Sequence, residues 1–109
     1  MPDQFSAWQL ILTGDLIDAH EAHRIGLVNE VVSATDLISR CETILKQITA
    51  NAPLAIRYSI DAVNEGVDTD LSSGLKLEAK YFALAAGTED RKEGTSAFVQ
   101  KRAPQFQGK

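Results

Sequence analysis

The stretch LILTGDLIDAHEAHRIGLVNEVV, residues 10–32, alternates short helical segments with residues that end helices. Apolar residues at helical spacing predict a helix over residues 6–12, and Gly14 suits its C-terminal cap. Asp18 can cap a second short helix over residues 19–25, which Gly26 can close. Residues 27–32 are the one β-branched cluster and the one strand candidate. A lone strand leaves its backbone groups unpaired, so this segment either pairs outside the chain or is not a strand.

Outward from this stretch the sequence predicts four more helices, over about residues 34–50, 53–66 and 70–86 and between Thr88 and Pro104. Cys41 falls on the apolar stripe of the first of them and is expected to be buried. Asp68 or Asp70 is expected to cap the third, and Thr88 the last. The predicted fold class is therefore mainly α, a small orthogonal helical bundle with one short extended segment.

Composition is that of an ordinary globular protein, with 44% hydrophobic and 24% charged residues in 109. A single cysteine excludes an internal disulfide framework and a cysteine-built zinc site. The start shows no signal peptide, and the aliphatic run of residues 10–12 is too short to cross a bilayer, so no membrane partner is expected.

Charge is unevenly distributed along the chain. Residues 1–90 hold 14 acids and 6 bases, whereas residues 91–109 hold 5 bases and one acid. The acidic body argues against nucleic-acid binding. The basic end is compatible with a local anionic partner such as a phosphate, or with a solvated tail.

Several motifs superficially indicate chemistry but have simpler explanations. His20 and His23 are three residues apart, whereas a metalloprotease helix needs four, so no metal site is predicted. Asp68-Thr69-Asp70 lacks the glycine and glutamate of a calcium loop and is expected to cap a helix. Acids at 89, 90 and 93 fall at a helix start, where the helix dipole accounts for them. No residue of this chain is assigned a catalytic role.

Three blocks, in order, carry a family resemblance: residues 10–32, NAPLAIRYSIDAVNEG at 51–66, and FALAAGTEDRKEGTSAFVQKRAPQFQGK at 82–109. Together they resemble the C-terminal part of the crotonase superfamily, most closely a short-chain enoyl-CoA hydratase of the 3-hydroxybutyryl-CoA dehydratase type. The residues that match the family's C-terminal signature are Thr88, Asp90, Glu93, Gly94, Phe98, Lys101 and Arg102.

The resemblance implies syn hydration of 2-enoyl-CoA thioesters in fatty-acid β-oxidation, with coenzyme A as the substrate carrier and no further cofactor. It implies that the β-spiral half, the oxyanion hole and both catalytic glutamates lie outside this chain, which alone is expected to be inactive. It also implies residues 1–33 as the end of the crotonase core and 34–109 as a C-terminal helical domain, in one compact unit. An isomerase or acyl-CoA hydrolase of the same superfamily, or a non-enzymatic helical interaction module, remains an alternative.

The resemblance also supplies the candidate site and partners. Phe82, Phe98 and Lys101 match family positions near bound acyl-CoA: the aromatic rings would form apolar walls and the lysine would meet a CoA phosphate. Arg102 could assist, and core packing is the other interpretation of both phenylalanines. Self-association, as a trimer or dimer of trimers, and a cytoplasmic location, or the mitochondrial matrix, are expected.

Overall fold

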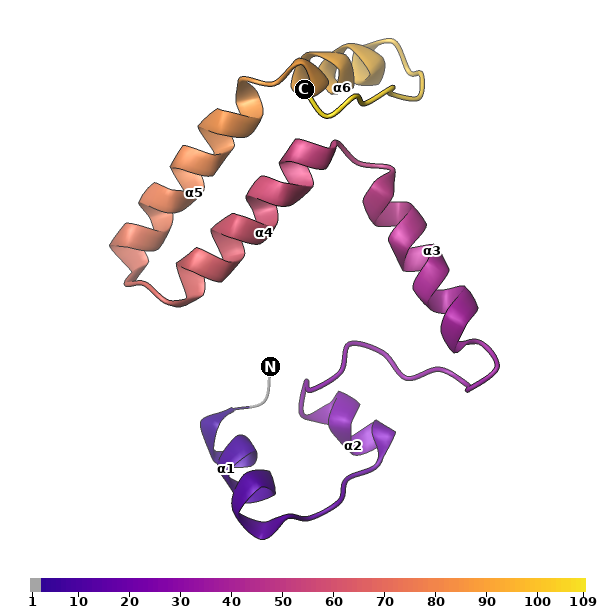
Figure 1. The fold of residues 1–109 in the computed structure, drawn as a ribbon, viewed down its shortest axis with the longest axis vertical. Helices are drawn as coiled ribbons and strands as arrows, with labels where there is room; N and C mark the ends of the chain where they lie inside the picture. Colours follow the sequence, from indigo (N-terminus) through magenta and orange to yellow (C-terminus); the bar gives the residue numbers. More distant parts are fainter. Residues whose placement is uncertain (1–2) are drawn as a thin grey trace. The chain divides into compact units, whose positions relative to one another are not determined.

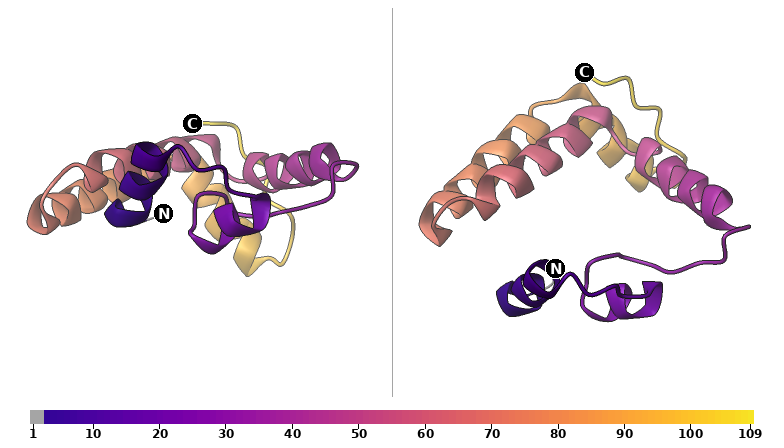
Figure 2. Two further views of the ribbon diagram at one scale, coloured as in Figure 1. Left: turned by 90° about the horizontal axis from the view of Figure 1, so that it is seen from below. Right: turned by 60° about the horizontal axis from the view of Figure 1, so that its bottom comes forward.

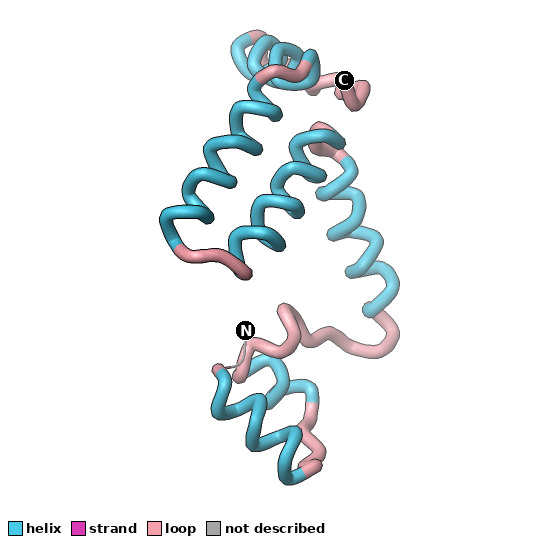
Figure 3. The backbone as a smooth tube through the Cα atoms, turned by 60° about the vertical axis from the view of Figure 1, so that its left-hand side comes forward, coloured by secondary structure: helices cyan, strands magenta, loops and turns pink. Residues whose placement is uncertain are grey.

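Six helices make up the regular structure of residues 3–109, which the computed structural model describes (Figure 1). Their bounds are α1 Gln4–Thr13, α2 Ala19–Arg24, α3 Leu37–Thr49, α4 Pro53–Val67, α5 Leu71–Ala86 and α6 Glu89–Val99. No strand occurs within residues 3–109, and the 27–32 segment consists of bends and irregular chain (Figure 3). The mainly-α prediction is thus confirmed, and no strand pairing takes up the backbone groups of the extended segment.

The chain divides into two compact units, Met1–Cys41 and Glu42–Lys109, with the division inside α3. The sequence placed a boundary earlier, at residue 33, within a single compact unit. The assignment of residues 1–33 to the end of a crotonase core stays a prediction. None of the helices within residues 3–109 combines the length and the apolar character that a membrane crossing needs.

Short-range capping explains the helix ends of the first unit. The Asp3 carboxylate accepts the Ser6 N–H at 2.8 Å, and the Asp18 carboxylate accepts the Glu21 N–H at 2.8 Å. Gly14 ends α1 in the left-handed region, with φ 71°. Helix α1 begins two residues before the predicted start, because Asp3 supplies a cap that the apolar spacing alone does not indicate.

Helices α4 and α5 lie side by side and antiparallel in the second unit, as the views in Figures 1 and 2 agree. Asp70 caps α5 by accepting the Ser73 N–H at 3.1 Å, whereas Asp68 is the residue that ends α4. The Tyr81 hydroxyl of α5 donates to the Glu65 carboxylate of α4, and the Tyr58 and Tyr81 rings lie 6.0 Å apart. These contacts hold the two helices in register.

Cys41 is exposed, so the prediction that it is a buried hydrophobe is wrong. Cys41 lies on an apolar stripe of α3, as predicted, but the stripe itself is exposed at Leu37, Leu45 and Ile48. A stripe becomes core only when another element covers it, and helical spacing alone does not reveal whether one does.

The carboxylate of Asp90 binds the C-terminal tail, residues 103–109. Asp90 is 3% exposed; its two oxygens accept the N–H groups of Gln107 and Gly108, each at 2.7 Å. Its own N–H donates to the Lys109 carbonyl at 3.1 Å. The tail therefore folds back to the start of α6, where Gly108 approaches Pro53 of α4. The helix dipole is thus only part of the reason for an acid at this position.

Glu93 makes the second attachment of the tail. Its oxygens accept two N–H groups of Arg102 at 2.6 and 2.8 Å, and one also accepts the Gln105 N–H at 2.8 Å. The Arg102 guanidinium, followed by the Gln105 amide, lowers the pKa of the Glu93 carboxyl to about 2. In this structure the Arg102 guanidinium is therefore occupied by its ion pair with Glu93.

Helix α6 ends in a Schellman motif with lysine where glycine is favoured. Lys101 has φ 53°, its N–H donates to the Phe98 carbonyl at 3.2 Å, and the Arg102 N–H donates to the Ala97 carbonyl at 3.0 Å. Helix α2 ends in the same bonding pattern, with Gly26 at φ 75° in the corresponding place. A side chain in the left-handed region costs about 1–2 kcal/mol relative to ordinary helical backbone.

Acid is expected to release the tail through Glu93. Its folded pKa, about 2, lies below the ordinary value of 4.5, so its contribution is complete above pH 4.5 and disappears as pH falls through 2. The amide resonances of Gln105 and Phe106 should therefore shift in that interval. In Glu93→Gln the same two resonances should have, already at neutral pH, the chemical shifts that the unsubstituted chain shows at low pH. Unchanged chemical shifts in Glu93→Gln at neutral pH would contradict the role of the charge.

Replacing Lys101 by glycine is expected to stabilise the chain by about 0.5–1 kcal/mol, since relief of the left-handed side chain exceeds the entropy that glycine loses on folding. Chemical denaturation of Lys101→Gly measures the change. The control is Lys101→Ala, which retains the Cβ and should leave stability nearly unchanged. Equal stability of both variants would show that the conformation carries no cost.

Candidate functional site

An apolar groove of about 470 Å³ opens where α4 begins, α5 ends and α6 passes; we call it the Phe82 groove. Its apolar wall residues include Ala52, Ala55, Phe82, Ala85, Gly94 and Phe106. Alanines and a glycine at these helix positions leave space that larger side chains would fill. The two phenylalanine rings that line the groove come from α5 and from the tail.

Phe82 also borders a smaller cleft of about 200 Å³ between α4 and α5, beside Tyr58 and Tyr81. The Glu65 carboxylate, which accepts the Tyr81 hydroxyl, raises the pKa of that hydroxyl to about 12. Tyr81 therefore stays protonated as a donor, and its contacts are structural.

Two charged residues line the Phe82 groove, and they differ in availability. The Asp90 carboxylate is buried and both of its oxygens accept tail N–H groups. Arg91 is exposed and forms no ion pair within residues 3–109. The groove thus combines apolar walls and the neutral polar residues Asn51, Thr88 and Thr95 with one available cation, which suits a ligand that carries an apolar chain and an anionic group.

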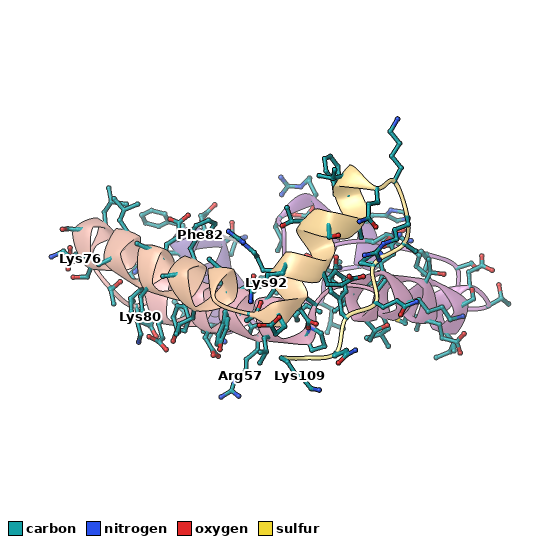
Figure 4. The ribbon with its side chains drawn as sticks, turned by 90° about the horizontal axis from the view of Figure 1, so that it is seen from above. Arg57, Lys76, Lys80, Phe82, Lys92 and Lys109 are labelled. Carbon is teal, nitrogen blue, oxygen red and sulfur yellow. The ribbon has the colours of Figure 1, made fainter. Side chains whose placement is uncertain are left out.

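Three site residues were predicted, and the structure places only one of them in this groove. Phe82 is 75% exposed and lines it. Phe98 is 84% exposed near the end of α6, and Lys101 is exposed just beyond it; neither lines the Phe82 groove. Figure 4 shows Phe82 and Lys80 on opposite sides of α5. Neither Phe82 nor Phe98 is packed into a core formed by residues 3–109. Their contact with acyl-CoA stays a prediction.

The tail residue Phe106 was not predicted as part of the site. Its ring lies 3.3 Å from where a Cβ on Gly94 would stand, so glycine allows this close approach without displacing the ring. A lone aromatic in the polar segment QFQGK, with a glycine in the preceding helix, is the signal that could have found it.

The basic end of the chain is partly neutralised. Lys92 pairs with Glu89 at 2.8 Å and Arg102 pairs with Glu93, both along a polar groove between α6 and the tail. Arg91, Lys101 and Lys109 form no ion pair within the described residues. These three cations are the ones available to an anionic partner.

Metal binding gains no support from the geometry. Across residues 3–109 no group of three or more His, Cys, Asp or Glu side chains is placed to hold an ion. In α2, Glu21 accepts two N–H groups of Arg24 at 2.6 Å rather than supporting His20 and His23.

Comparison with known proteins relates the sequence to one family. The sequence model described as enoyl-CoA hydratase/isomerase matches residues 4–109. A crotonyl-CoA hydratase of Syntrophomonas wolfei is 44% identical over 100 residues, which are 92% of this chain and 38% of that protein. A short-chain-enoyl-CoA hydratase of Clostridioides difficile is 46% identical over 92 residues, covering 84% of this chain and 59% of that protein.

Solved structures agree with the sequence comparison. The crystal structure of an enoyl-CoA hydratase from Bacillus anthracis matches 95% of this chain with a TM-score of 0.93 at 38% identity, and the match covers 40% of that chain. An enoyl-CoA hydratase/isomerase from Mycobacterium paratuberculosis gives the same TM-score at 30% identity, over 99% of this chain and 43% of that one. The helical arrangement of nearly this whole chain therefore recurs as a part of larger proteins.

This chain thus spans only about two fifths of most of the relatives it matches, as expected for the helical part of a crotonase fold. The match over residues 4–109 and the agreement of sequence and structure confirm the resemblance: the chain belongs to the enoyl-CoA hydratase/isomerase family.

Proposed function

We propose that this chain contributes part of a coenzyme A thioester site and a subunit contact to an enoyl-CoA hydratase, which adds water to 2-enoyl-CoA. The observation that carries the proposal is the family match over residues 4–109. Relatives at 44% and 46% identity are named crotonyl-CoA hydratase and short-chain-enoyl-CoA hydratase, which favours short acyl chains.

The site would be built from the exposed residues at the end of α6 and from the Phe82 groove. Phe82 and Phe98 offer apolar surface that packing within the chain does not use. Lys101 carries an ammonium without an ion pair within residues 3–109, suited to a CoA phosphate. The backbone of Lys101, with φ 53° in the left-handed region, supports a functional role for this residue, because energetically costly backbone conformations cluster at binding sites.

Binding without turnover is what the described residues support. Hydration needs proton transfer to and from water and the α-carbon, together with donors for the enolate oxygen. The only carboxylate that lines the Phe82 groove is that of Asp90, and both of its oxygens are occupied by tail amides. An isomerase or hydrolase would share this binding part, because the reaction is determined by residues outside it.

Self-association is the second part of the proposal. Apolar residues stand exposed at helical spacing on α4, at Ile60, Val63 and Val67, and on α1, at Phe5, Trp8 and Leu12. Such stripes are typical of surfaces that another protein surface covers. A trimer or dimer of trimers is the assembly that the family resemblance implies, and a purely non-enzymatic interaction module would use the same stripes.

Titration with crotonyl-CoA tests the binding role. We expect the amide resonances of Phe82, Phe98 and Lys101 to shift and the enoyl absorbance to stay constant. Lys101→Ala should weaken binding about fivefold, as removal of one exposed charge contact does. Lys76→Ala, which removes an exposed lysine of α5 (Figure 4), is the matched control. Hydration at an enzyme-like rate would refute binding without turnover, and absence of any shift would refute the CoA site.

Sedimentation tests the subunit contact. The weight-average mass should rise with concentration, and Val63→Glu should lower it because a charge then interrupts the apolar stripe of α4. Asn64→Glu adds the same charge one residue away and serves as the control. A chain that stays monomeric at high concentration would overturn the self-association proposal.

A further inference from the structure

The tail is fixed so that one of its side chains becomes a wall of the Phe82 groove. Phe106 lies between two attachment points: Gln105, whose N–H is held by Glu93, and Gln107, whose N–H is held by Asp90. The neighbouring Gly108, with φ 74°, brings the backbone to Pro53 at the start of α4. With both flanking amides bound to α6, the Phe106 backbone has little freedom to move away from the groove.

The ring of Phe106 packs against α6 at Gly94 and lines the groove together with Phe82. A Cβ on Gly94 would stand 3.3 Å from the ring, so a larger residue there would require the ring to move by a few tenths of an ångström. The tail contributes no other residue to this groove's lining, so tail docking affects the groove through Phe106.

We propose that Asp90 is a positioning residue that holds the tail so that Phe106, which lines the groove together with Phe82, contacts the acyl chain of a bound CoA thioester. This inference rests on the proposed function and adds to it a residue that recognises the acyl chain. The occupant follows from the lining of the groove. Beside its apolar walls the groove has two charged residues: Asp90, whose oxygens are satisfied, and Arg91, which is available to an anionic group. Its other polar lining residues, Asn51, Thr88 and Thr95, are neutral. An apolar chain on an anionic carrier fits this distribution.

Affinities for butyryl-CoA and for CoA without an acyl group, measured by calorimetry on the full chain, test the proposal. Phe106→Ala should weaken butyryl-CoA binding about tenfold, as loss of part of an aromatic contact does, and leave CoA binding unchanged. Phe106→Leu should retain most of the affinity. Leu71→Ala removes an exposed apolar side chain from the end of α5 away from the groove and should change neither affinity.

Asp90→Asn tests the positioning role, since an amide offers one acceptor oxygen to two tail N–H groups. It should weaken butyryl-CoA binding to a similar extent, and the Asp90→Asn, Phe106→Ala double variant should lose no more than either single variant. Additive losses would mean that Asp90 acts on the fold rather than through Phe106 and would overturn the proposal. The NMR dispersion of residues in α4 and α5 confirms that each variant remains folded.

The possible results separate this inference from the function on which it rests. If the unsubstituted chain binds neither CoA nor butyryl-CoA, the proposed function fails and the inference fails with it. If CoA and butyryl-CoA both bind and Phe106→Ala affects neither, the CoA site stands and the inference alone is refuted. If Phe106→Ala weakens the binding of CoA and of butyryl-CoA equally, Phe106 contacts the CoA part of the ligand. That result would also refute the contact with the acyl chain.

Discussion

The buried carboxylate of Asp90 is the interaction on which the second unit depends. A charge in the protein interior is tolerated only when hydrogen bonds replace its water, and here two tail amides do so at 2.7 Å. The same residue lies in the first turn of α6, where the helix dipole also favours an anion. One side chain thereby joins the start of a helix to the end of the chain, and the position of Phe106 follows from it.

Burial is scarce elsewhere in the described chain. Among its hydrophobic residues only Ala22 and Ala97 are buried, whereas apolar stripes on α1, α3, α4 and α5 stay exposed. The helices therefore owe their limits to local capping, and packing within residues 3–109 leaves their apolar faces exposed. This is the pattern expected of a part that recurs within larger enoyl-CoA hydratases.

Sequence reasoning succeeded where the decisive contact is local. Asp18 and Thr88 cap helices by bonds to residues three positions ahead, and Gly14 ends α1 at its own backbone. It failed where burial depends on a distant partner. Cys41 lies on an apolar stripe and is nevertheless exposed, and Asp90 meets amides 17 and 18 residues away, which no periodicity reveals. The place of Phe106 in the groove was missed for the same reason.

The two Schellman motifs of this chain form an internal comparison that bears on function. Helices α2 and α6 end with the same pair of backbone bonds, yet one has Gly26 and the other Lys101 in the left-handed position. Glycine has no Cβ to clash in the left-handed region, so the turn itself does not account for a lysine at the end of α6. Nor is it explained by a partner within residues 3–109, since the ammonium forms no ion pair there. A cation just beyond the end of α6 is favoured by the negative end of the helix dipole, and in the proposed site it would also complement a CoA phosphate.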